Sequence, residues 1–125
     1  MRWLDRRIAA PGPFLALCLS QAEFDKVEAR LGLKTGTAFV NSGADATMHV
    51  FSAPRGLACV VCLARWEGRD PIEVAGCLVH EAVHVWQAYA SSIGERRPGD
   101  EQEAYAVQAI AQELLAEFAR RMKAR

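Results

Sequence analysis

Hydrophobic positions divide this chain into a front part that predicts mainly strands and a back part that predicts helices. Residues 13–19 form a compact apolar run that is compatible with a buried strand. Residues 47–52 and 57–64 are two more runs with strand character, and the Pro and Gly at 53–56 predict a hairpin turn between them. A short strand is also expected at 38–40, ahead of a turn rich in Asn, Ser and Gly.

Three helices are predicted from their start signals and their apolar spacing. Ser20 and Glu23 match a capping box, and Gly32 is a natural stop for the helix that follows. A second start signal lies at residues 70–73, where Asp precedes Pro and Glu occupies the third helical position. The apolar stripe of this second helix is predicted to consist of Ile72, Ala75, Val79, Val83, Trp86 and Ala90.

The last predicted helix follows a surface loop at residues 91–99. Asp100 is its expected N-cap, and the helix is expected to reach about Met122. Its apolar stripe is predicted to contain Val107, Ile110 or Ala111, Leu114 and Phe118. Together these elements predict one α+β domain over residues 1–125, with a small antiparallel sheet packed on helices.

Composition and charge narrow the classes of function. The chain has 15 basic and 15 acidic residues, which predicts neither a nucleic-acid partner nor attraction to an anionic membrane. The apolar run at 57–64 is far shorter than the roughly 20 residues of a membrane span. The N-terminus superficially resembles a signal peptide, but Asp5 and the Pro-Gly-Pro at 11–13 interrupt it, so a cytoplasmic protein is expected. No pattern indicates an oligomeric state.

Four cysteines are present, and two of them form the pair Cys59-Val60-Val61-Cys62. This pair lies in a predicted strand, where residues three apart point to opposite faces and cannot chelate one ion. We therefore expect the cysteines to be small buried hydrophobic residues.

The strongest chemical signal is His80-Glu81-Ala82-Val83-His84, inside the second predicted helix. Positions four apart on a helix lie roughly 40° apart, so both imidazoles can reach one ion. Glu81 points about 100° away from His80, a direction that suits proton transfer from a metal-bound water. The alternative is that these are ordinary residues of an amphipathic helix.

A catalytic zinc usually has three protein ligands, so a third ligand is needed. Glu103 lies four residues before Val107 and so continues the apolar stripe of the last helix; it is the expected ligand unless it only completes a capping box with Asp100. Cys77 shares the histidine face and would instead suggest a closed structural site, although packing one turn below the ion is the favoured role. Tyr89, Tyr105 and His49 are candidates for oxyanion or substrate contacts.

The order of elements, the His80–His84 motif and the sequence Glu103-Ala104-Tyr105 resemble the gluzincin metallopeptidases, especially minigluzincins and related phage or prophage-encoded peptidase-like proteins. The resemblance covers the back two thirds of the chain. It implies Zn²⁺ held by His80, His84 and Glu103, with Glu81 as general base and then proton donor, and a peptide or protein substrate. The alternative is a non-catalytic zincin-fold binding or phage-associated protein with a structural or relic zinc site.

Overall fold

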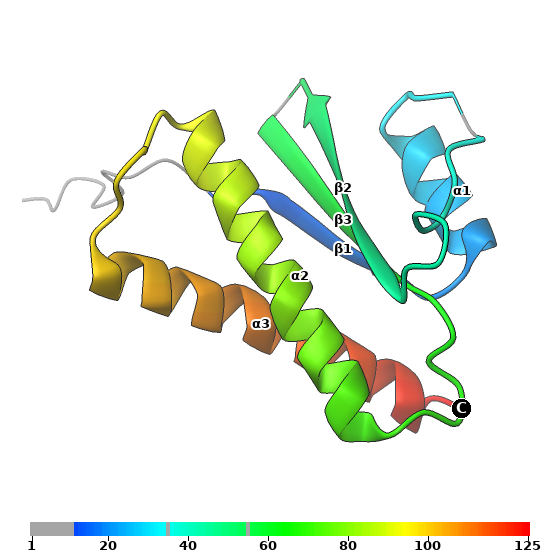
Figure 1. Cartoon of the computed structure of the whole chain (residues 1–125). Helices are drawn as coiled ribbons and strands as arrows, with labels where there is room; N and C mark the ends of the chain where they lie inside the picture. The colour runs from blue at the N-terminus through cyan, green and yellow to red at the C-terminus, as the bar shows by residue number, and fades with distance from the viewer. Residues whose placement is uncertain (1–11, 35, 55) are drawn as a thin grey trace, which may run out of the picture.

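The computed structural model describes residues 12–34, 36–54 and 56–125 (Figure 1). This part of the chain forms three strands and three helices, so the fold is α+β as predicted. In chain order the elements are β1 (Phe14–Cys18), α1 (Gln21–Arg30), β2 (Ala46–Ala53), β3 (Gly56–Leu63), α2 (Pro71–Ser92) and α3 (Asp100–Lys123).

The three strands form one sheet in the order β1-β3-β2. The predicted hairpin is confirmed, because β2 and β3 pair antiparallel, with Ser52 opposite Leu57. The expectation of a purely antiparallel sheet is wrong, because β1 and β3 run parallel. β2 runs antiparallel to β1. The hairpin after β2 reverses the chain direction, so β3 lies between the two strands and runs in the direction of β1.

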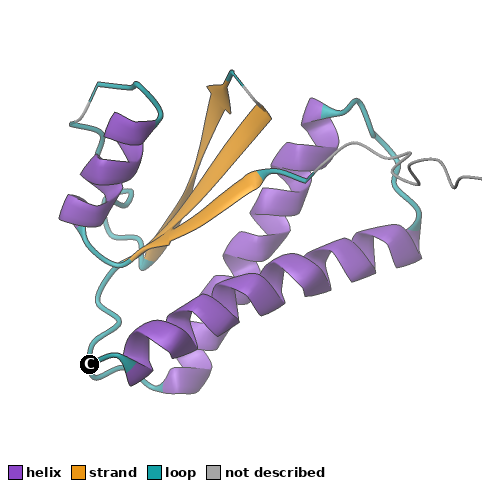
Figure 2. Cartoon of the chain, turned by 180° about the vertical axis from the view of Figure 1, so that it is seen from behind, coloured by secondary structure: helices purple, strands orange, loops and turns teal. Residues whose placement is uncertain are grey.

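The sheet is covered on both faces: α1 lies on one side, and α2 and α3 lie on the other (Figures 1 and 2). The central strand β3 is therefore buried on both sides, which accounts for its continuous apolar sequence. Cys59 packs with the α2 and α3 side chains, whereas Cys62 packs with Phe24 of α1. This confirms the prediction that the two cysteines face opposite ways, and all four cysteines are free thiols.

The start of α1 matches its prediction, since the Ser20 side chain accepts a hydrogen bond from Glu23 N at 3.2 Å. The strand expected at 38–40 is wrong, because that segment is a loop. Its backbone is held by a side chain, with Phe39 N donating to Gln21 Oε1 at 3.1 Å, and the Phe39 and Val40 side chains pack beside Phe24. The apolar residues thus contribute to the core without a partner strand.

The start of α2 is also as predicted, with Asp70 Oδ1 accepting from Ile72 N at 2.8 Å. The predicted apolar stripe is wrong in part, because Ile72 is 78% exposed and Val79 is 41% exposed. The helix presents a different face to the sheet, formed by Val74, Leu78, Ala82 and Val85, all of them buried. The face that contacts the sheet is rotated by roughly 100° around the helix axis from the predicted stripe.

Helix α3 begins at Asp100, and its N-cap is Gly99 without a side-chain hydrogen bond. Asp100 is therefore the first helical residue and not the expected cap, although its charge in the first turn still favours the helix dipole. The predicted apolar stripe is confirmed from Ile110 to Phe118, with Ala111 and Leu114 buried in the core that α3 shares with the sheet, whereas Val107 does not belong to this cluster.

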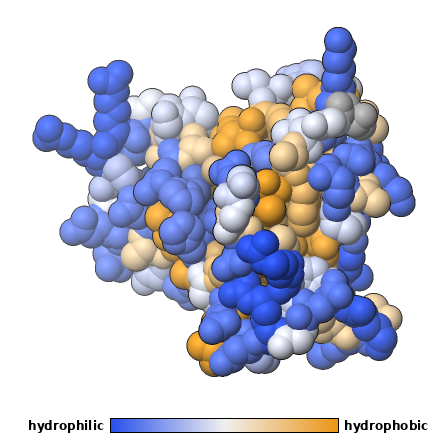
Figure 3. Space-filling view, turned by 45° about the vertical axis from the view of Figure 1, so that its right-hand side comes forward, coloured by the Kyte–Doolittle hydropathy of each residue, from blue (hydrophilic) through white to orange (hydrophobic). Residues whose placement is uncertain are grey.

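The face of the molecule seen in Figure 3 is mostly hydrophilic, with apolar side chains gathered toward its middle. Among the helices of the described residues, none combines the length and the apolarity that crossing a membrane requires.

Candidate metal centre

Helix α2 brings His80 and His84 together on its exposed surface, as the spacing predicts. Their Nε2 atoms lie 3.2 Å apart, and the two rings meet edge to face with centroids 4.8 Å apart. Two nitrogen ligands of a tetrahedral zinc, each about 2.0–2.1 Å from the ion, are separated by roughly 3.3 Å. The two ring nitrogens therefore already have the spacing of two ligands of one ion.

Gln87 orients one of these rings. Nδ1 of His84 donates a hydrogen bond to Gln87 Oε1 at 3.0 Å. A neutral imidazole that donates from Nδ1 has an unprotonated Nε2. His84 Nε2 is thus the acceptor of the 3.2 Å contact and His80 Nε2–H is its donor. His84 already has the unprotonated nitrogen that a metal ligand needs, and His80 would give up its Nε2 proton when an ion binds.

Glu81 lies on a different side of α2 and is buried, with 6% of its surface exposed. It borders a cleft of about 600 Å³ between α2 and β2. Among the described residues no hydrogen bond to its carboxylate is found. The cleft is lined by Asn41, Ala46, Thr47, Met48, His80, Glu81, His84, Gln87 and Ala88.

A second cleft, of about 460 Å³, adjoins the first and shares His80 and Glu81 with it. Cys77 lines this second cleft together with Glu73 and Asp45. Asp45 is already engaged, since Arg65 donates a hydrogen bond to it at 2.6 Å and thereby keeps the pKa of this carboxyl below its ordinary value. Cys77 is partly buried one turn below the histidines, which agrees with the packing role favoured for it.

Glu103 is not next to the histidine pair. Its Oε2 accepts a hydrogen bond from Trp86 Nε1 at 2.9 Å, and Glu103 borders neither of the two clefts. Trp86 follows His84 by two residues and so points roughly 160° away from it around α2. Glu103 is exposed, so the expectation that it continues the buried apolar stripe of α3 is wrong. In this arrangement it is a hydrogen-bond partner of a buried tryptophan, and its role as a ligand stays a prediction.

The three candidates for oxyanion or substrate contacts lie elsewhere. His49 is on the α1 side of the sheet, stacked on Phe24 at 4.5 Å, and its Nε2 lies 2.9 Å from the Phe39 carbonyl oxygen. Tyr89 packs against Trp86, and Tyr105 is 67% exposed on α3. None of the three borders the cleft that contains His80, Glu81 and His84.

Three polar residues of the cleft were missed by the sequence reasoning: Asn41, Thr47 and Gln87. Gln87 had a readable signal, because it lies one helical turn after His84 and so shares its face. Asn41 and Thr47 had none, because a loop and the position of β2 beside α2 place them at the border of the cleft.

Within residues 12–34, 36–54 and 56–125, no group of three or more His, Cys, Asp or Glu side chains is placed to hold a metal ion. The donor set thus fits two positions of a metal site. Comparisons with protein-family models, with curated proteins and with solved structures give no match for this chain.

Proposed function

We propose that this protein is a zinc-dependent hydrolase that cleaves a peptide or other amide bond. One observation carries the proposal: the Nε2 atoms of His80 and His84 are 3.2 Å apart at the edge of a cleft that also contains the buried Glu81. A purely structural pair of ligands has no need of a carboxylate beside it, whereas metal-assisted hydrolysis does.

His80 and His84 would hold the ion, and a zinc ion there supplies a bound water of lowered pKa and an electrophilic centre. Glu81 accepts the proton of the attacking water and later delivers it to the leaving amine. Its burial limits competing hydration of the carboxylate, and α2 holds it one residue from His80. Gln87 keeps His84 in the tautomer that binds metal.

The cleft also suits an extended substrate. β2 is an edge strand of the sheet, and its residues 46–48 form one wall of the cleft opposite the histidines. An extended peptide can add to such an edge through backbone hydrogen bonds, with its scissile bond over α2. This arrangement supports a peptide substrate more directly than a small amide.

The third ligand is the open part of the proposal. The resemblance implies Glu103, and ligation by this residue would require its carboxylate to leave Trp86. The same observation favours a second candidate function, a non-catalytic zincin-fold binding or phage-associated protein in which the two histidines are a relic or part of a structural site. A third ligand is therefore the feature that separates an enzyme from its inactive counterpart.

The test uses Glu81→Gln and a matched control, Glu101→Gln, which changes an exposed carboxylate of α3 in the same way. Zinc-loaded wild type and both variants are incubated with a library of unstructured peptides, and cleavage is followed by mass spectrometry. We expect the wild type and the control to cleave, and Glu81→Gln to retain zinc but lose about 10²–10⁴-fold in rate. Absence of cleavage by zinc-loaded wild type would favour the binding protein.

A further inference from the structure

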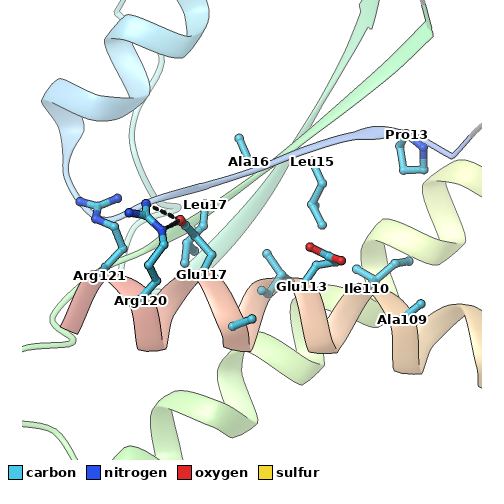
Figure 4. Close-up of a pocket in the computed structure, with 12 residues that line it drawn as sticks. Pro13, Leu15, Ala16, Leu17, Ala109, Ile110, Glu113, Glu117, Arg120 and Arg121 are labelled. Atoms are coloured by element: carbon cyan, nitrogen blue, oxygen red, sulfur yellow. Dashed lines mark hydrogen bonds and ion pairs between the residues drawn. The ribbon is translucent and has the colours of Figure 1, made fainter. Parts of the chain in front are cut away.

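A groove of about 890 Å³ lies between β1 and α3, at the β1 edge of the sheet (Figure 4). Two arginines border it, and both are paired within the chain, Arg120 with Glu117 and Arg121 with Glu23. Among the described residues that line this groove there is no histidine or cysteine, and the histidine pair borders the cleft between α2 and β2 instead. Groups that act on a substrate beside the histidine pair therefore have to come from that cleft.

Three polar side chains of the cleft lie outside the H-E-x-x-H motif, and two of them are already engaged. The Oε1 of Gln87 accepts from His84 Nδ1, the ring nitrogen on the opposite side from the Nε2 that faces His80. Thr47 is 8% exposed, and its Oγ1 accepts from Asn41 N at 2.8 Å. The remaining lining residues outside the motif are apolar. Asn41 is left as the available donor, because it is exposed and no hydrogen bond of its carboxamide is found among the described residues.

The backbone of Asn41 is fixed on both sides. Its N–H donates to Thr47 Oγ1 at 2.8 Å, and its carbonyl oxygen accepts from Ala44 N at 2.9 Å, which closes a turn over residues 41–44. Gly43 has a φ of 78°, a value that favours glycine, so the sequence suits this turn. Thr47 belongs to β2, and its hydrogen bond therefore attaches the turn to the strand that borders the cleft. A donor on a fixed backbone needs little reorganisation when it binds a developing charge.

We propose that the Asn41 carboxamide donates a hydrogen bond to the scissile carbonyl oxygen as this oxygen becomes negatively charged. This role rests on the proposed function, and it supplies the oxyanion donor that Tyr89, Tyr105 and His49 do not supply from their positions outside the cleft. In the addition step a water oxygen bonds to the carbonyl carbon, the proton of the water goes to Glu81, and the C=O electron pair moves onto the carbonyl oxygen. When this electron pair returns, the C–N bond breaks and Glu81 delivers the proton to the leaving nitrogen. Asn41 acts in both steps on the oxygen that carries the charge.

The test compares zinc-loaded wild type with Asn41→Ala, Asn41→Asp and the control Ser42→Ala, which truncates the next residue, exposed and outside the cleft. Asn41→Ala and Asn41→Asp should each lower kcat for a cleaved peptide by about 10²–10³-fold, because neither side chain can donate to the oxyanion. KM should change by less than about threefold, since this hydrogen bond is made in the transition state. Thr47→Val removes the acceptor of the Asn41 N–H and should lower kcat by about tenfold, whereas Thr47→Ser keeps the acceptor and should retain the wild-type rate.

Binding gives a readout that does not depend on turnover, and circular dichroism reports whether each variant is folded. A phosphonamidate peptide carries a charged tetrahedral oxygen in place of the oxyanion, so its affinity, measured by titration calorimetry, should fall about 10²-fold in Asn41→Ala, while the zinc affinity stays within about twofold. The side-chain amide signal of Asn41 in the NMR spectrum, identified by its loss in Asn41→Asp, should shift when the phosphonamidate binds. A kcat and a phosphonamidate affinity equal to those of Ser42→Ala would overturn the role of Asn41 and leave the proposed function standing. A zinc-loaded wild type that neither cleaves peptides nor binds the phosphonamidate would overturn both.

Discussion

The hydrogen bond between Glu103 and Trp86 gives a prediction that separates a structural role from ligation. Trp86 is 4% exposed, and its Nε1–H donates to Glu103, an exposed residue at the edge of the buried region. Glu103→Ala should therefore leave a buried donor unsatisfied. Glu103→Gln should preserve the bond, because its amide oxygen can accept as the carboxylate does.

The expected magnitude follows from this burial. An unsatisfied buried donor costs about 1–3 kcal/mol, and the exposed position of Glu103 places the effect in the lower half of that range, because truncation of its side chain lets some water reach the Trp86 Nε1–H. For a domain of 125 residues this corresponds to a fall in melting temperature of roughly 4–8 °C. Glu103→Gln should cost about 0.5 kcal/mol or less.

The assay is urea unfolding of the zinc-free protein in the presence of a chelator, with Glu101→Ala as control. That control removes a carboxylate from the same first turn of α3, so it reports the loss of the favourable interaction with the helix dipole alone. The prediction is a large loss for Glu103→Ala and small losses for Glu103→Gln and the control. If Glu103→Ala matches the control, the carboxylate does not stabilise Trp86 and the structural role assigned to it is refuted. Zinc affinity of Glu103→Gln, measured in parallel, reports ligation separately.

Three further predictions follow. Gln87→Leu removes the acceptor of the His84 Nδ1–H and should weaken zinc binding about tenfold in a competition assay with a chromogenic chelator. Gln108→Leu, which changes an exposed glutamine of α3 in the same way, is the control, and equal zinc affinities of the two variants would contradict the prediction. The hydrogen bond from Arg121 lowers the pKa of Glu23 in the folded protein. The pair therefore stabilises the fold fully above the pKa that Glu23 has in the unfolded chain, near 4.3, and this stabilisation is lost as the pH falls through the lower pKa of Glu23 in the folded protein. The gap in urea midpoint between wild type and Arg121→Met should therefore narrow between about pH 6 and pH 3, and a constant gap would exclude the pair as its cause. Burial raises the pKa of the Cys59 thiol to about 11, and Cys18 and Cys62 are as deeply buried as Cys59. Native protein at about pH 8 should therefore react with a thiol reagent at one site, Cys77, which is only partly buried. Fast reaction of three or more thiols per chain would be inconsistent with the fold.

The sequence predicted correctly those features that depend on residues close together in the chain. The caps at Ser20 and Asp70 and the turn of the β2–β3 hairpin depend on residues a few positions apart, and all were correct. The parallel direction of β1 was missed because it depends on how the chain returns to the sheet through the loop after α1. The buried face of α2 was missed for a similar reason, since Ile72 and Val79 have helical spacing but lie away from the sheet.

The candidate site divides in the same way. The convergence of His80 and His84 follows from helical geometry alone, and the structure has it. The position of Glu103 depends on how α3 packs against α2, which no local pattern specifies, and the structure places its carboxylate on Trp86. His49 illustrates the same limit, because the alternation of side chains along β2 sends it to the α1 face of the sheet.

The most direct test of the central claim is the zinc content of the purified protein, measured by elemental mass spectrometry after incubation with the metal and removal of the excess. His84→Ala is compared with wild type and with His49→Ala, which removes the histidine that stacks on Phe24 on the opposite face of the sheet. The account predicts about one zinc per chain in the wild type and in His49→Ala, and almost none in His84→Ala. No zinc in the wild type, or the same content in all three proteins, would contradict it.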